Sequence, residues 1–250
     1  MHDTKLGIGL ATGMFFHAAA GTALPTYPTE NVGANGDGTS TDKFTATSAQ
    51  VSFSLTDSCN EIKSFTIDGV EQDPEDYSVS GTTVTWAGTS LTGGEKVAIT
   101  YFVSAWRLVG DVTSDGITVN TDKSVENIRN WANVIKRTIL SDHTETVQVP
   151  VMDTTEDALK TVIGAGNVTV TPASGSHGKT IACNLSSSDL PDAEAYLFVM
   201  KDGDDTMAVG MSNGQITAME SITFAPSGTI NWTPTITAQE NGLVFISEEG

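Results

Sequence analysis

Short runs in which apolar and polar residues alternate, separated by glycine-containing turns about every ten residues, dominate this chain. Two of these runs are FTATSAQVSFSL at 44–55 and TTVTW at 82–86. The β-branched and aromatic residues that fill them favour extended backbone. A chain of 250 residues is long enough for two modest domains, each with its own core. The pattern therefore predicts a mainly β protein of two domains.

One segment, DTTEDALKTVI at 153–163, predicts a helix. Asp153 or Thr154 can cap its N-terminus, and acidic residues occupy its first turn. The apolar residues fall on one face, and Gly164 ends the segment: Ala158, Leu159 and Val162. A single helix with one narrow apolar face is expected to lie across the open side of a sheet.

Composition divides the chain into parts. An opening strand at 6–16 is ended by prolines, and a linker follows at 31–42 with the sequence NVGANGDGTSTD. Residues 43–102 contain about six short strands, including a hairpin across Gly81, and predict a small immunoglobulin-like sandwich. The last domain begins near Ser104.

In the last domain, Asp115-Gly116 supplies the backbone angles of a tight hairpin. Residues 123–131 could form one or two helical turns or a strand-edge loop. The segment 134–152 alternates in two stretches and predicts a long hairpin that turns around Asp142-His143. Further strands are expected at NVTVTP, AEAYLFVMKD, TMAVGMSN, ITAMESITFAP, TINWTPTITAQ and LVFIS.

The formal net charge of -19 disfavours binding to phosphate backbones and to anionic membrane surfaces. The charge fits a surface that does not retain DNA, but simple solubility is the more common reason for such a charge. The apolar stretch at 6–23 resembles a secretory signal, but Asp3, His17 and interspersed glycines argue against one, and the stretch is too short to span a bilayer. Cys59 and Cys183 fall in different predicted domains, which argues against a disulfide.

No pattern indicates a catalytic, cofactor or metal site. The histidines lie outside recognisable catalytic motifs: His2, His17, His143 and His177. DPED at 73–76 reads as a solvated turn, and GIGLATG at 7–13 lacks the flanking elements of a phosphate loop. Three acids around Gly203 suit either a calcium loop or a β-turn: Asp202, Asp204 and Asp205.

The four tryptophans are dispersed along the chain, which favours core or interface packing over a sugar-stacking platform: Trp86, Trp106, Trp131 and Trp232. A carbohydrate-binding role for 43–102 stays open as an alternative.

The order of four segments resembles the major tail (tail tube) protein of long-tailed phages of the siphophage type: LVGDVTSDGITVN, ENIRNWANVIKRTIL, TVQVPVMDTTEDALKTVIG and GTINWTPTITAQ. The opening KLGIGLATGMFFHAAAGTALP resembles the family's first strand and loop. The positions that match the family's outline are Trp106, Leu108, Gly110, Asp115, Gly116, Trp131 and Gly164. The resemblance covers 1–30 and 103–250 as one discontinuous domain and leaves 43–102 as an insert.

The resemblance implies a tail-tube β-sandwich or barrel with one packing helix, and subunits that polymerise as hexameric rings stacked into a genome-conducting tube. It implies no enzymatic activity and no cofactor. The implied partners are further copies of the chain, the tape measure and the tail terminator, while DNA transits the lumen without specific binding and no membrane is involved. The protein would be made in the host bacterial cytoplasm and reside in the virion tail.

For the tube, we expect the hairpin around 133–151 to line the ring, 31–42 or another long loop to bridge subunits, and 153–163 to pack outside the sheet. Residues 43–102 would decorate the outer surface, because an inward position would block the channel. The alternative is a secreted or surface-attached adhesive module whose 43–102 domain binds glycans or protein. Deletion of 43–102 discriminates the two, since a tube subunit would still self-associate and an adhesin would lose binding.

Overall fold

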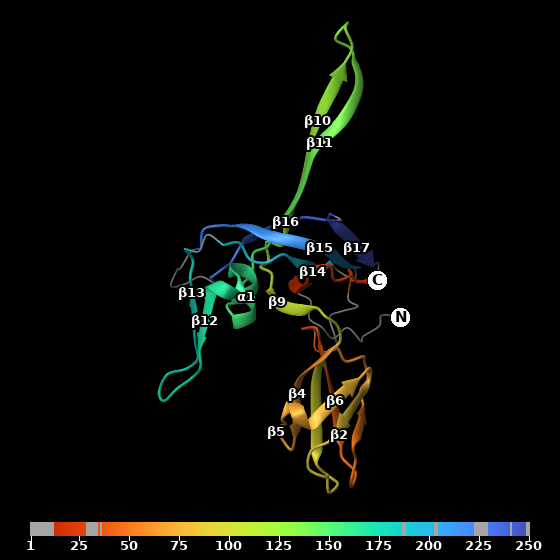
Figure 1. The fold of residues 1–250 in the computed structure, drawn as a ribbon, viewed down its shortest axis with the longest axis vertical. Coiled ribbons are helices and arrows are strands. Elements are labelled where there is room, and N and C mark those ends of the chain that lie inside the picture. The colour runs from red at the N-terminus through yellow and green to blue at the C-terminus, as the bar shows by residue number, and fades with distance from the viewer. Residues whose placement is uncertain are drawn as a thin grey trace. The chain divides into compact units, whose positions relative to one another are not determined.

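The computed structural model describes residues 13–28, 35, 37–186, 189–202, 205–222, 230–240 and 242–248. The described residues are mainly β strand, and α1 (Glu156–Ile163) is their one α-helix. They fall into two compact units (Figure 1). Unit 1 contains the described residues of Pro25–Leu108, and unit 2 those of Leu10–Leu24 and Val109–Gly250.

Unit 1 consists of two antiparallel sheets that share one core. The larger sheet has the order β2 (Thr39–Thr45), β8 (Lys96–Phe102), β4 (Glu61–Ile67) and β5 (Val70–Glu71). The smaller has the order β3 (Ser52–Ser54), β7 (Thr83–Trp86) and β6 (Tyr77–Ser80). Phe65 and Ile99 from the first sheet and Phe53 from the second are buried together in this core. Gly81, at φ +61°, forms the predicted β6–β7 turn.

Strand β2 begins inside the segment predicted as a linker, so that prediction is wrong for 39–42. Local hydrogen bonds order the backbone here despite the scarcity of apolar residues. The Asp37 carboxylate accepts a hydrogen bond from the backbone N–H of Thr39 at 3.1 Å, and the N–H of Asn35 donates to the Thr39 carbonyl at 2.9 Å. Residues 31–34 and 36 lie outside the described residues.

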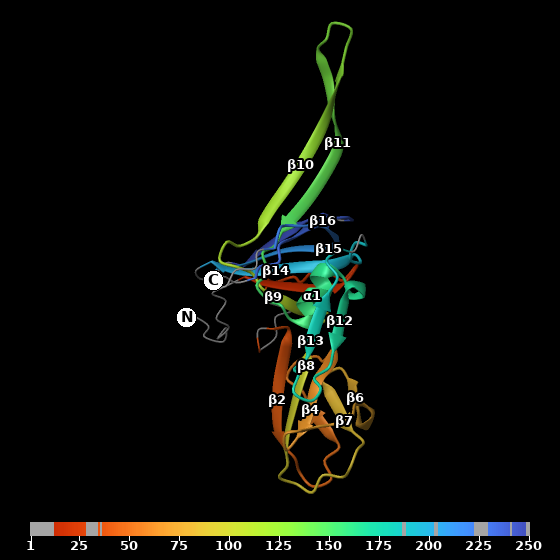
Figure 2. The same ribbon diagram turned by 90° about the vertical axis from the view of Figure 1, so that its left-hand side faces the viewer.

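Unit 2 is built on an eight-stranded sheet with the order β10-β11-β16-β15-β14-β1-β9, in which β17 also pairs with β15 (Figures 1 and 2). The pairings from β10 through β1, and that of β17 with β15, are antiparallel. The bounds are β1 Met14–Ala19, β9 Arg107–Asp111, β10 Thr118–Arg129, β11 Ile135–Gln148, β14 Glu194–Asp202, β15 Asp205–Met219, β16 Pro234–Ala238 and β17 Val244–Glu248. Strands β12 (Val168–Thr171) and β13 (Thr180–Cys183) form a separate ribbon.

The central strands of this sheet are buried on both faces. Phe15, Tyr196 and Phe198 point into a core that includes the apolar face of α1. Their neighbours in β1 and β14, including Phe16 and Leu197, are also buried. Burial on both sides explains why these strands read as continuous apolar runs rather than as alternating ones.

The predicted helix is confirmed as α1, but it begins at Glu156, later than predicted. The cap is Thr155, whose side-chain oxygen accepts a hydrogen bond from the N–H of Ala158 at 3.2 Å. Asp153, predicted as a cap, instead accepts a hydrogen bond from the backbone N–H of Asp111 at 2.7 Å. Gly164 ends the helix at φ +94°, and the predicted apolar face packs into the sheet core.

Three sequence predictions about the strands of unit 2 are wrong. The turn at Gly116 forms, but it joins β9 to β10 without pairing them. Residues 123–129 are strand, because β10 pairs with β11 through a turn at 130–134 rather than at Asp142-His143. The predicted strand TMAVGMSN and the start of ITAMESITFAP belong to one strand, β15. Residues 223–229 lie outside the described residues, as do 6–12 of the predicted opening strand.

The polar residues that suggested a turn at 141–143 instead accompany a β-bulge. Ser124 pairs with Asp142 and Val125 with Leu140, so Ser141 is the extra residue. The true turn uses Asn133 at φ +59°, a left-handed angle that asparagine tolerates better than most residues.

The cap assignment predicts the outcome of a pair of alanine substitutions. Thr155→Ala removes the cap hydrogen bond and should lower the free energy of unfolding by about 1 kcal/mol. Thr154→Ala, at the neighbouring exposed position, should leave it nearly unchanged. Urea unfolding followed by circular dichroism measures both values, and a larger loss in the Thr154 variant would contradict the assignment.

Candidate assembly surface

The hairpin of β10 and β11 extends from the large sheet of unit 2 with little support (Figures 1 and 2). Strand β11 pairs with β16 only through Thr146, Val147 and Gln148, and every residue of β10 is exposed. Two-stranded hairpins are marginally stable in water when nothing packs on them. A long unsupported hairpin is therefore a feature that another molecule is expected to cover.

Large apolar side chains are exposed along this hairpin: Val119, Val125, Ile128, Trp131, Val134, Ile135 and Leu140. Trp131, in the turn, is fully exposed with a relative accessibility of 105%. Isolated exposed apolar residues are normal, but a concentration of them on one projecting element marks an interaction surface.

Hydrogen bonds within the hairpin fix the geometry around Trp131. The side-chain oxygen of Asn130 accepts a hydrogen bond from the N–H of Val134 at 2.9 Å, and Arg129 donates to the carbonyl of Asn133 at 3.0 Å. The N–H of Asn133 also donates to the carbonyl of Asn130 at 2.8 Å. The indole is thus presented on an ordered turn.

The distal part of the hairpin, residues 127–141, is basic in an acidic chain. It carries Arg129, Lys136 and Arg137 and no acidic residue, whereas the whole chain has a formal net charge of -19. We call residues 127–141 the hairpin tip. Its charge is opposite to that of the rest of the chain, which favours contact with an acidic protein surface.

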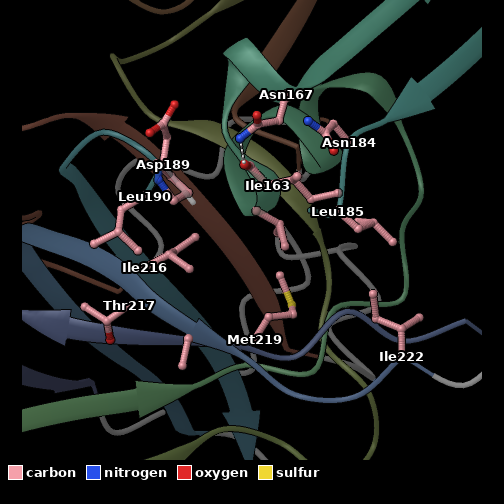
Figure 3. Close-up of a pocket in the computed structure, with 13 residues that line it drawn as sticks. Ile163, Asn167, Asn184, Leu185, Asp189, Leu190, Ile216, Thr217, Met219 and Ile222 are labelled. Atoms are coloured by element: carbon pink, nitrogen blue, oxygen red, sulfur yellow. Dashed lines mark hydrogen bonds between the residues drawn. The ribbon is translucent and has the colours of Figure 1, made fainter. Parts of the chain in front are cut away.

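A second feature of unit 2 is an apolar groove with a volume of about 270 Å³. Figure 3 shows side chains that converge on it from the end of α1, from 184–185 and 189–191, and from β15. Ile163, Leu190, Ile216 and Met219 supply much of its lining. Leu185 and Leu190 are both more than half exposed at the groove.

The described residues among those considered for catalysis or metal binding are not brought together. His17 lies 3.0 Å from Glu194, and His143 lies 3.2 Å from Glu145, at separate places in unit 2. The backbone of His177 closes a small turn, and His2 is outside the described residues. Within the described ranges, no three histidine, cysteine or acidic side chains are grouped so that they could hold a metal ion.

The acidic segments occupy turns. DPED forms a short 3₁₀ helix at Pro74–Asp76, with Asp73 accepting a hydrogen bond from the N–H of Glu75. Asp202 pairs with Asp205 across the β14–β15 hairpin, while Gly203 and Asp204 lie outside the described residues. So does nearly all of GIGLATG, of which only Gly13 is described.

The tryptophans and cysteines have distinct surroundings. Trp86, Trp106 and Trp232 are buried, and only Trp131 among the four is exposed. Sequence reasoning favoured core or interface packing for all four tryptophans and did not distinguish Trp131 from the other three. The polar residues Arg129, Asn130 and Asn133 around it were a signal that its segment is exposed. Cys59 and Cys183 are free, and burial raises the pKa of both thiols.

A model of the phage tail tube protein family matches residues 80–243, which is well over half of the chain. The chain belongs to the phage tail tube protein family. The matched range includes the whole β10–β11 hairpin, α1 and most of the large sheet. Comparison with curated proteins finds no match.

Membership of this family makes the chain a structural component of a phage tail that assembles with further copies into the tube. The mainly β fold agrees with this assignment. Within the described residues, no helix is both long enough and apolar enough to cross a membrane. Because its apolar side chains are exposed, the β10–β11 hairpin is the feature of unit 2 most suited to contact another tail protein.

The contrast between Trp131 and Trp232 predicts opposite effects on stability. Trp131→Ala should change the free energy of unfolding of dilute protein by less than about 0.5 kcal/mol, because the side chain is exposed. Trp232→Ala should cost about 3–5 kcal/mol, because it empties a core position. Urea titrations measure both. A large loss for Trp131→Ala would mean that the indole packs within its own subunit.

Proposed function

We propose that the chain polymerises as stacked hexameric rings into the tail tube that delivers the genome, and that the β10–β11 hairpin is its main intersubunit arm. The observation that carries the proposal is the row of exposed apolar side chains on an element that only three residue pairs anchor to the sheet. Six-fold symmetry rests on the resemblance to siphophage tail proteins.

Burial of the hairpin in an assembly would be favourable by several kcal/mol. A tryptophan side chain buries about 150–250 Å², which at about 25 cal/mol per Å² corresponds to about 4–6 kcal/mol for Trp131 alone, before the cost of association. The remaining apolar residues of the hairpin add to this gain. The apolar side chains of the hairpin are not buried within their own subunit, so the favourable free energy of burying them would be gained only in the tube.

Free strand edges support the closure of a ring. In the described sheet, β9 and β10 are the end strands, and β17 adds a further edge with Phe245 exposed. Contacts between different surfaces of identical subunits close into rings when the rotation permits, and a second set of contacts extends the rings into a tube. Neighbouring subunits would then cover edges that would otherwise be prone to aggregation.

The remaining parts of the proposal follow from the family resemblance. The acidic composition supports a lumen that repels DNA phosphates, so that the genome passes without binding. Helix α1 would lie outside the sheet with respect to the channel. Tape measure and tail terminator proteins would contact the tube, and the subunits would be made in the host cytoplasm before they enter the virion tail.

We also propose that residues 43–102 form an immunoglobulin-like insert that decorates the outer surface. Unit 1 has a core of its own, and the first and last strands that build it are neighbours. Thr39 pairs with Phe102, and the N–H of Val103 donates to the carbonyl of Gly38 at 3.1 Å. Chain ends that lie side by side permit the insertion or removal of a domain without disturbing its host.

Shortening of the hairpin tests the arm. In the variant, 124–142 are replaced by Asn-Gly, which joins the paired residues Lys123 and His143 through a tight turn. The wild type should form rings or tubes with a central hole in negative-stain electron microscopy over a concentration series. The shortened variant should remain monomeric and keep the unfolding midpoint of the wild type. A wild type that stays monomeric at every concentration would overturn the proposal and favour an adhesive module.

Excision of unit 1 tests the insert. A variant in which a short glycine-serine linker joins Gly38 to Val103 should still form tubes, of smaller outer diameter and unchanged central hole. Electron microscopy of the two tubes side by side measures both dimensions. A wider hole in the variant would place 43–102 inside the channel, and the loss of tubes from a folded variant would show that the domain takes part in assembly.

A further inference from the structure

We propose that the apolar groove of unit 2 receives the hairpin tip of a neighbouring copy, with Trp131 as the inserted side chain. This inference rests on the self-assembly proposed above and assigns the surface that the arm contacts. Its basis is a pair of features that have no partner among the described residues of this unit: a fully exposed indole on an ordered turn, and an open apolar groove between α1 and β15.

The groove has the lining that an aromatic ring requires. Ile163 comes from the last turn of α1, Ile216 and Met219 come from β15, and Leu190 from the segment before β14 (Figure 3). Ile163 and Met219 also pack against the core, which makes the floor rigid. An apolar surface of this kind binds a flat ring by close packing and by release of water.

The size of the groove fits an indole. A cavity of about 150 Å³ holds a benzene ring, so a volume of about 270 Å³ has room for the larger ring of tryptophan. A buried indole also needs an acceptor for its N–H. Asn167 and Asn184 both line the groove and carry side-chain oxygens, and Asn167 is held by its hydrogen bond to the carbonyl of Ile163 at 2.9 Å.

The charges are complementary. The groove lining contains Asp189 and no basic residue, and the exposed acids Asp192 and Glu220 follow lining residues directly in sequence. The tip brings Arg129, Lys136 and Arg137 without an acid. Opposite potentials orient such an encounter, whereas two tips or two grooves would repel each other.

A second copy is the occupant that the observations favour. Trp131 is fully exposed, so the tip of the same chain does not fill the groove. The other exposed large aromatic residues described, Tyr27 and Phe245, do not combine an aromatic ring with a cluster of basic residues on a projecting turn. The tip is therefore the element of this chain best matched to the groove in size, polarity and charge.

Disulfide cross-linking between copies tests the contact directly. Cys59 and Cys183 are first replaced by alanine, and tip variant Ala132→Cys is mixed with groove-rim variant Leu190→Cys under mild oxidation. The expected product is a covalent dimer on a denaturing gel, with the 132–190 link identified by peptide mass spectrometry. The matched control pairs Ala132→Cys with Val70→Cys, an exposed position on β5 of unit 1, and should give at least tenfold less product.

Cross-linking and electron microscopy of the same samples separate the two proposals. Rings or tubes without the 132–190 link would overturn the groove assignment and leave the proposed function intact. The link without rings or tubes would support the groove and count against the tube. The absence of both would overturn both, and a link to a co-purified tail protein in place of a second copy would also overturn this assignment.

A charge substitution provides an independent check. Leu190→Lys removes an exposed apolar side chain and adds a positive charge opposite the basic tip, so the concentration needed for assembly should rise at least tenfold. Val70→Lys, which makes a similar change at an exposed position of unit 1, should leave it unchanged. Trp131→Phe should assemble better than Trp131→Ala. Equal assembly of the Leu190 and Val70 variants would contradict the groove contact.

Discussion

Strand β15 is the element on which the other features of unit 2 depend. Its pairing with β14 runs from Asp205 to Gly214, and its other edge pairs with β17 and then with β16. Strand β16 in turn pairs with the base of β11. The position of the hairpin is therefore set by two strand pairings, β15 with β16 and β16 with β11. The last residues of β15 also form one wall of the groove. One strand thus positions both proposed contact surfaces, and packing on β14 makes it rigid.

In every strand of this unit successive side chains point to opposite faces, but the two faces are buried in some strands and exposed in others. In β1 and β14 both faces are apolar and buried, which gives the sheet its stability. In β10 both faces are exposed, and the apolar residues scattered along the hairpin find no partner within the subunit. A hairpin of this kind contributes little to folding of the monomer. Its sequence is better explained by a requirement of the assembled state, in which apolar side chains on an extended arm are covered.

The sequence allowed the β class, the helix and the β6–β7 turn to be predicted, because each depends on local signals such as the positive φ of Gly81 and the apolar face of α1. The turn of the long hairpin was predicted at the wrong residues for two reasons. Asn133 is a weaker turn signal than glycine, and the polar residues around the β-bulge at Ser141 resemble those of a turn. Trp131 was recognised as a residue for core or interface packing, but only the structure separates it from the buried Trp232. The groove could not be predicted, because Ile163, Leu190 and Ile216 are brought together by the fold of the whole unit.

The proposed contact combines pairing of exposed charges with burial of an indole, and the two contributions differ in size and therefore in role. Exposed charge pairs contribute about 0–1 kcal/mol each and are screened by salt, whereas burial of an indole contributes several kcal/mol. The apolar term therefore determines how firmly subunits hold, and the charges determine which surfaces meet. With a formal net charge of -19, copies of this chain repel one another in most orientations. This repulsion is weakest in the orientation in which a basic tip faces an acidic partner surface, which gives assembly a directional preference.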